Sequence, residues 1–132
     1  MKAGLIRFML MVTAVMALVL TTGVGSAIGQ SMVKDQKFET YRKAILKEQG
    51  IDIKKYREKL KGGRADGRDI TRYELDELLM GIKVEREHTT DKYTALEIAT
   101  DHLEEFPDYY TRLEDMEEKA EKDWKDKRRN TK

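Results

Sequence analysis

The sequence predicts an all-α protein, a compact domain of four to five helices that follows an N-terminal signal helix. Apolar residues recur at spacings of three and four along most of the chain, as on the buried face of a helix. Threonines followed by acidic residues, and single glycines, stand where helices would begin and end. The near absence of strict alternation predicts almost no strand content.

The N-terminal segment has the layout of a secretory signal peptide. Two basic residues, Lys2 and Arg7, precede an apolar run over residues 8–20 and a stretch of small residues. Signal peptidase accepts small side chains at positions −3 and −1, which Gly25 and Ala27 provide. Residues 1–27 are therefore predicted to be cleaved off, which makes the protein secreted or periplasmic.

An uncleaved anchor is the alternative interpretation of this segment. A membrane-spanning helix needs about 20 apolar residues, and residues 5–24 approach that length. The Thr-Thr-Gly-Val-Gly sequence at 21–25 favours cleavage instead. Contact with a membrane is expected only through this segment, and only if it stays attached.

The charge balance excludes some partners. Residues 1–27 contain Lys2, Arg7 and no acidic residue, so the rest of the chain has 24 basic and 25 acidic residues. Such a balance creates no overall field that would attract nucleic acid, so no nucleic-acid partner is expected. The chain has no cysteine, so disulfides cannot stabilise its modest core.

The mature part is predicted to start with a flexible lead over residues 28–34, followed by a helical domain over 35–129. A first helix is expected to end at Gly50, a second short one to run from Ile51, and a glycine-rich loop to occupy 62–69. The inward residues expected on the two helices are Phe38, Tyr41, Ile45 and Leu46, then Ile53, Tyr56 and Leu60.

The middle of the domain contains two further predicted helices. Thr71 and Glu74 have the spacing of a capping box, which predicts a helix that buries Leu75, Leu78 and Leu79 and ends at Gly81. Residues 82–85 alternate and are expected to be extended. Thr89 or Thr90 should cap the next helix, over 91–106, whose buried face is predicted to hold Ala95, Ile98, Ala99, His102, Leu103 and Phe106.

The last predicted helix follows the single proline, Pro107, which suits the first position of a helix. Acidic residues lead this helix and basic residues trail it, in agreement with the helix dipole. Its aromatic side chains are expected to be packing anchors, along a line formed by Tyr110, Leu113, Met116, Ala120 and Trp124.

Only a small set of carboxylates and imidazoles could carry chemistry. His88 and His102 lie 14 positions apart, about 20 Å along a helix, so they cannot bind one metal ion unless the chain folds back. His102 and Glu105 lie within one turn and could share a proton or a metal, although a metal site needs a third ligand. We expect His102 to be a packed core residue. The candidate functional cluster is Glu85, Glu87, His88, His102 and Glu105.

Two segments carry a resemblance to a known family. They are Gly81–Thr89 (GIKVEREHT) and Ile98–Leu113 (IATDHLEEFPDYYTRL), within a similar region of about 72–118. The chain resembles a small family of bacterial and phage proteins that share a domain of unknown function. The resemblance therefore implies membership of a family but no activity. Members often have a glycine-containing insert after the Glu-His pair, which this chain lacks. The resemblance also marks three residues as possible contact residues, namely Asp108, Tyr109 and Tyr110.

These observations predict a non-enzymatic exported protein that acts through contacts with an unknown macromolecular partner at the cell envelope or outside. No cofactor and no metal are expected. The alternative is a metal-binding or hydrolytic protein that uses His102, Glu105 and the segment 85–88, with His102 and Glu105 as the metal ligands.

Overall fold

The computed structural model describes residues 24–130, with side chains from residue 27 onwards. These residues form four α-helices and two 3₁₀ turns and no strand, which confirms the all-α prediction. In chain order the elements are α1 Val24–Gln49, η1 Ile53–Lys55, η2 Ile70–Arg72, α2 Leu75–Glu85, α3 Lys92–Glu105 and α4 Tyr109–Asn130.

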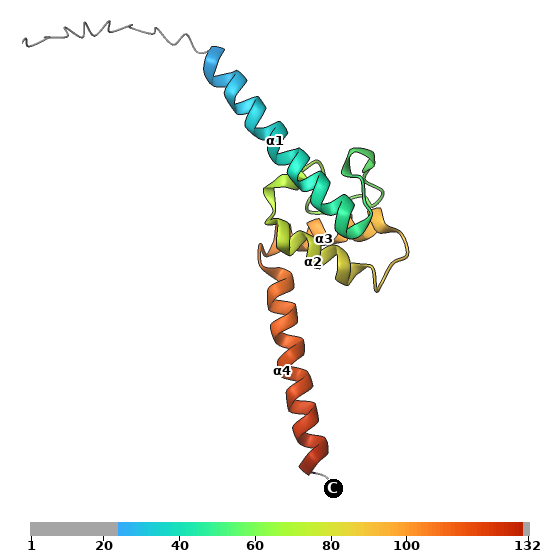
Figure 1. The fold of residues 1–132 in the computed structure, drawn as a ribbon. Coiled ribbons are helices and arrows are strands. Elements are labelled where there is room, and N and C mark those ends of the chain that lie inside the picture. Colours follow the sequence, from blue (N-terminus) through green and yellow to red (C-terminus); the bar gives the residue numbers. More distant parts are fainter. Residues whose placement is uncertain (1–23, 131–132) are drawn as a thin grey trace, which may run out of the picture.

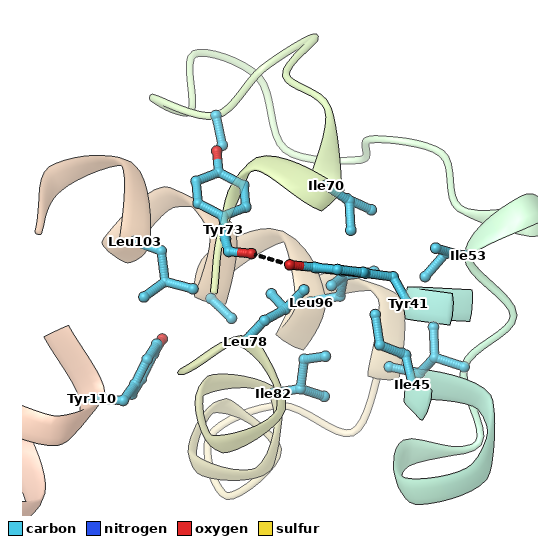
Figure 2. Close-up of a cluster of buried hydrophobic side chains, with 13 residues drawn as sticks. Tyr41, Ile45, Ile53, Ile70, Tyr73, Leu78, Ile82, Leu96, Leu103 and Tyr110 are labelled. Carbon is cyan, nitrogen blue, oxygen red and sulfur yellow. Dashed lines mark hydrogen bonds between the residues drawn. The ribbon is translucent and has the colours of Figure 1, made fainter. Parts of the chain in front are cut away.

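The core lies between α2 and α3, which pack against each other more extensively than any other pair of helices. Figure 2 shows Leu78 and Ile82 of α2 in the same cluster as Leu96 of α3. The C-terminal half of α1 closes this cluster with Tyr41 and Ile45. All five side chains are buried, so a continuous apolar cluster joins three helices.

One hydrogen bond ties α1 to the segment before α2. The hydroxyl of Tyr41 donates to the backbone carbonyl of Tyr73 over 2.7 Å, and both residues are buried (Figure 2). A buried carbonyl without a partner would cost about 1–3 kcal/mol. This bond therefore contributes to the docking of α1 on the body.

Two helices extend beyond this body in different directions (Figure 1). Residues 27–37 of α1 are all exposed, and α1 becomes buried only from Tyr41 onwards. Within α4, Tyr110 is the single buried residue. The body thus consists of the end of α1, the loops, α2, α3 and the first turn of α4.

The first third of the described chain differs from the prediction. Residues 28–34, expected to be a flexible lead, are part of α1. Once Tyr41 and Ile45 hold the helix, each further residue adds a backbone hydrogen bond at little cost. Leu46, expected inward, is exposed, and Gly50 ends the helix as predicted with a φ of 66°.

The prediction of a second short helix from Ile51 is also wrong. Only Ile53–Lys55 form a single 3₁₀ turn, and Leu60 is exposed. Asp52 caps this turn through the Lys54 N–H and binds Arg42 of α1 at 2.8 Å, so local side-chain contacts replace a longer helix. The glycine-rich segment 62–69 lies outside the helices, as predicted.

The predicted capping box does not form. The backbone N–H of Thr71 is bonded instead to Asp69 at 3.0 Å, which starts the 3₁₀ turn η2. Helix α2 begins after Glu74, which makes no side-chain capping hydrogen bond. Gly81 lies inside α2, and residues 82–85, expected to be extended, complete the helix.

The buried face of α3 is rotated relative to the predicted one. Asp91, rather than a threonine, is the N-cap residue, and it accepts from Tyr93 N and Thr94 N. The loop preceding α2 covers one side of α3, so Leu96, Glu97 and Thr100 are buried. Phe106, predicted to be buried, lies beyond the end of the helix and is 53% exposed.

The last helix begins at Tyr109, two residues after Pro107. Trp124, predicted to be a packing anchor, is exposed, as is Met116 on the same predicted line, because α4 leaves the body after its first turns. Within residues 24–130, no helix has the length and apolar character needed to cross a membrane. The apolar run 8–20, and with it most of the predicted signal peptide 1–27 and anchor 5–24, lies outside the described residues.

Candidate functional site

Four of the predicted residues meet where the ends of α2 and α3 join the start of α4. Glu85 of α2 is 8% exposed, and its Oε1 accepts a 2.9 Å hydrogen bond from the hydroxyl of Tyr110. The same oxygen lies 3.7 Å from Nε2 of His102 on α3. We call Glu85, His102, Tyr109 and Tyr110 the Glu–His–Tyr cluster.

Aromatic contacts complete the cluster. The ring of Tyr109 stacks on the imidazole of His102, with centroids 4.2 Å apart and planes 8° apart. The Tyr110 ring stands edge-on to both, at 6.1 Å from His102 and 5.0 Å from Tyr109. His102 is thus held between α2 and α4 while about a third of its side chain, 32%, remains exposed.

Burial makes the hydroxyl of Tyr110 harder to ionise. Removal from water, and then the hydrogen bond to the Glu85 carboxylate, hold the pKa of Tyr110 well above its usual value. The hydroxyl therefore remains a donor to the buried carboxylate even at alkaline pH, where an exposed tyrosine would ionise. The imidazole of His102 is a second polar neighbour of the same carboxylate. Chemically, the cluster brings a carboxylate, a phenol and an imidazole into contact with one another.

The other predicted candidates lie apart from this cluster. Glu87 and His88 are exposed in the turn after α2. Glu105 points to Arg64 of the glycine-rich loop at 3.0 Å, although it lies one turn from His102 in sequence. Asp108 pairs with Arg112 at 2.7 Å, and this guanidinium lowers the pKa of the Asp108 carboxyl. The predicted residues are therefore divided among four places: the cluster, the turn after α2, the Arg64 contact and the Arg112 contact.

The metal alternative needs at least three ligands in one place. Between residues 24 and 130, no three or more histidine or acidic side chains are grouped as they would be around a metal ion. His102 and Glu105, the proposed ligand pair, turn to different partners, namely Glu85 and Arg64.

A row of carboxylates on α3, not predicted from the sequence, binds the preceding loop. Glu97 is buried and accepts from Lys59 N at 3.0 Å and Leu60 N at 2.9 Å. Asp101 accepts from Ala65 N at 2.8 Å, and Glu104 accepts from the Tyr73 hydroxyl at 3.0 Å. Their spacing of four and three along α3 puts them on one side of the helix, which was the available signal. We call Glu97, Asp101 and Glu104 the acidic row.

A further residue that was not predicted, Glu77, holds the start of α4. The carboxylate of Glu77 on α2 accepts from Tyr110 N at 3.0 Å and from Thr111 N at 3.3 Å. The first N–H groups of a helix have no partner inside the helix, so Glu77 takes the place of a local capping residue. It anchors the base of α4 beside the Glu–His–Tyr cluster.

An apolar groove opens on the outer side of this junction. It is lined by Phe106, Tyr109, Arg112, Leu113 and Met116. Phe106 and Met116 are exposed, by 53% and 58%. Further along the same helix Trp124 is also 58% exposed. Exposed apolar residues in such a row are typical of interaction surfaces.

The fold and the site define a small all-helical domain with a buried carboxylate–tyrosine pair at the base of a projecting helix. The chain belongs to a family of proteins of unknown function, DUF5661, whose family model matches residues 42–119. This confirms the expected membership in an uncharacterised family, and the match begins 30 residues before the region in which we noted the resemblance. No curated protein and no solved structure matches the chain.

Proposed function

We propose that the protein is an exported, non-enzymatic helical protein, and that α4 acts by binding another macromolecule at the cell envelope or outside. The observation that carries the proposal is the exposure of α4. Of its 22 residues only Tyr110 is buried, while Met116 and Trp124 are each 58% exposed. A helix that only packed on its own domain would turn these side chains inward.

The anchoring of α4 supports the same function. Glu77, Tyr110 and the Glu–His–Tyr cluster fix the first turn of α4 to the body. Beyond Leu113, which still packs against the core, α4 projects into solvent (Figure 1). A helix with a fixed base and an exposed, partly apolar surface is suited to binding, because it loses little orientational freedom when a partner binds.

Export is supported by the sequence of the N-terminal segment, with its basic residues, apolar run and small residues. N-terminal sequencing of the secreted or periplasmic protein should begin at Ile28 or within a few residues of it. Recovery of only the full-length chain, starting at Met1 in the membrane fraction, would contradict cleavage.

The binding function is tested by photo-crosslinking in the native host. A photoreactive amino acid replaces Met116 in the full chain, and in a matched variant it replaces Glu118, which lies on the opposite side of α4. We expect a discrete covalent adduct from position 116 and none from position 118. No adduct from position 116 would overturn the proposal.

A second candidate is the metal-binding or hydrolytic function based on His102. The 3.7 Å approach of His102 to the buried Glu85 favours it, since such a pair can accept and release a proton. Glu105, the second residue expected to take part in this function, pairs with Arg64 instead. The metal titration described in the Discussion separates the two functions.

A further inference from the structure

We propose that the macromolecule bound by α4 is a second copy of this chain, with the two α4 helices packed antiparallel. This inference rests on the proposed function and names the partner of the same surface. Four features of α4 support it: its apolar stripe, its charge distribution, the side chains that would meet, and its projection from the body.

The apolar stripe runs along one face of α4. Leu113, Met116, Ala120 and Trp124 are spaced by three, four and four residues, which keeps them in line on a straight helix. The stripe continues the groove that Phe106 and Tyr109 begin. Over 22 residues the helix is about 33 Å long, enough for several turns of helix–helix packing.

Charge is divided between the two halves of α4. Residues 114–118 contain four acidic residues and no basic one, whereas 125–129 contain four basic residues and one acidic one. Within the second half, Lys125 pairs with Glu121 and Arg129 with Asp126, and the net charge of the segment stays positive. An antiparallel pair places each acidic half against the basic half of the partner. A parallel pair would place like charges together, which is unfavourable.

The same arrangement brings the largest exposed side chains together. With acidic segment against basic segment, the two helices cross close to Ala120, whose small side chain permits close approach. Met116 then lies within a turn of the partner's Trp124. Methionine sulfur beside an aromatic ring is a favourable contact, and both side chains lose exposure to water.

The position of α4 allows such pairing. The helix extends away from the body (Figure 1), and its apolar residues beyond the groove are not covered by other elements of residues 24–130. An isolated helix of this length is only marginally stable in water, and packing of an apolar face is the usual source of its stability. A second copy supplies that packing symmetrically.

The test uses the absence of native cysteine from the chain. Single cysteines are introduced into the full chain as Ala120→Cys, Lys122→Cys and Asn130→Cys and treated with a short bismaleimide. Ala120 lies on the stripe at the crossing, Lys122 lies on the opposite face at nearly the same height, and Asn130 lies at the end. In an antiparallel pair the two Asn130 positions would be about 30 Å apart.

We expect a covalent dimer from Ala120→Cys and none from the two other variants. A dimer from Asn130→Cys would show parallel packing and overturn the proposal. So would the absence of a dimer from Ala120→Cys. A photo-adduct from Met116 whose mass is not that of two chains would overturn the self-pairing and leave the proposed function standing, whereas no adduct would overturn both.

Charge reversal tests the arrangement independently, with each change placed in the Ala120→Cys background. One variant changes the four acidic residues of 114–118 to lysine, and a second changes the four basic residues of 125–129 to glutamate. Each alone should give about tenfold less dimer, because like charges then face each other. Mixing the two should restore a mixed dimer. Unchanged dimer yield in the single variants would contradict antiparallel pairing, and circular dichroism checks that both remain helical.

Discussion

The aromatic ring of Tyr110 on α4 lies directly against the backbone of Gly81 on α2. A β carbon placed on Gly81 would lie 2.8 Å from Tyr110 Cδ2 and closer still to Cε2. Gly81 therefore permits the approach that lets the Tyr110 hydroxyl reach Glu85. Gly81, predicted to end a helix, is instead the contact point of two helices.

Gly81→Ala should destabilise the protein by about 1–3 kcal/mol, because the tyrosine ring must shift to avoid overpacking. Helix propensity alone predicts the opposite, a gain of about 1 kcal/mol. The measurement is the free energy of unfolding in urea. Gly29→Ala in α1 is the control, because its β carbon meets nothing within 4 Å. Equal stability of the Gly81 variant and the wild type would refute the contact.

Tyr110→Phe should cost about 1–3 kcal/mol, because it leaves the buried Glu85 carboxylate without its hydroxyl donor. Tyr93→Phe removes a hydroxyl from a partly buried tyrosine outside the cluster and should cost less. Urea denaturation of both variants measures the difference. Similar losses in the two would show that the Glu85 contact contributes little.

Stability should fall as the pH rises above about 10. Burial raises the pKa of Tyr110 and of Tyr73, and in each case a carboxylate that accepts the hydroxyl proton adds to the shift. The unfolded chain then loses these protons near pH 10 while the folded chain keeps them. Each such tyrosine lowers the free energy of unfolding by about 1.4 kcal/mol per pH unit. Below pH 10 the contribution is fully present.

Urea midpoints between pH 8 and 11.5 test this expectation. Tyr110→Phe should show a shallower loss over the same range, because one of the linked protons is gone. A midpoint that stays constant up to pH 11.5 would show that these tyrosines ionise equally in both states.

Phe106→Ala should cost less than about 1 kcal/mol, whereas Leu103→Ala should cost about 2–5 kcal/mol. Phe106 is 53% exposed and Leu103 only 2%, although both belong to the stripe predicted from the sequence. Denaturant midpoints of the two variants compare them directly. Because Phe106 lines the apolar groove, Phe106→Ala should also weaken the pairing of the two α4 helices. A large loss of stability on removal of Phe106 would contradict its exposed position.

His102→Gln separates the binding function from the metal alternative. We expect zinc, manganese and calcium at low excess to leave the melting temperature unchanged in both the wild type and the variant. A rise in the wild type with one metal, and none in His102→Gln, would instead identify His102 as a ligand, since binding to the native state stabilises it. A metal-dependent rise in the wild type that disappears on acidification would support the same conclusion, because metal binding by an imidazole weakens as acid protonates it.

The sequence was sufficient for the helical class, the end of α1 at Gly50 and the loop at 62–69, because glycine and helical spacing act locally. The start of α2 could not be predicted in this way. Asp69 binds the Thr71 N–H that the expected capping box would have placed at a helix start. The Asp69 turn and the Thr71–Glu74 capping box both compete for this segment of backbone, and the sequence alone does not show which of the two is more stable in the fold.

The candidate site was predicted in part for a similar reason. Glu85, His102, Tyr109 and Tyr110 come together because Gly81 and Glu77 bring the base of α4 onto α2. Neither contact leaves a periodic signal in the sequence. Periodicity also gives no means to distinguish a helix face covered by the body from one that projects past it, so the prediction of Trp124 as a packing anchor was wrong.

The acidic row binds the preceding loop mainly through backbone N–H groups, including those of exposed Lys59 and Leu60. Every residue except proline offers that group. Evolution can therefore change the outward side chains at 59 and 60 without loosening the loop, while the buried carboxylate of Glu97 carries the constraint for both. Related proteins can therefore differ in the charge and polarity of this loop surface while they keep the same fold.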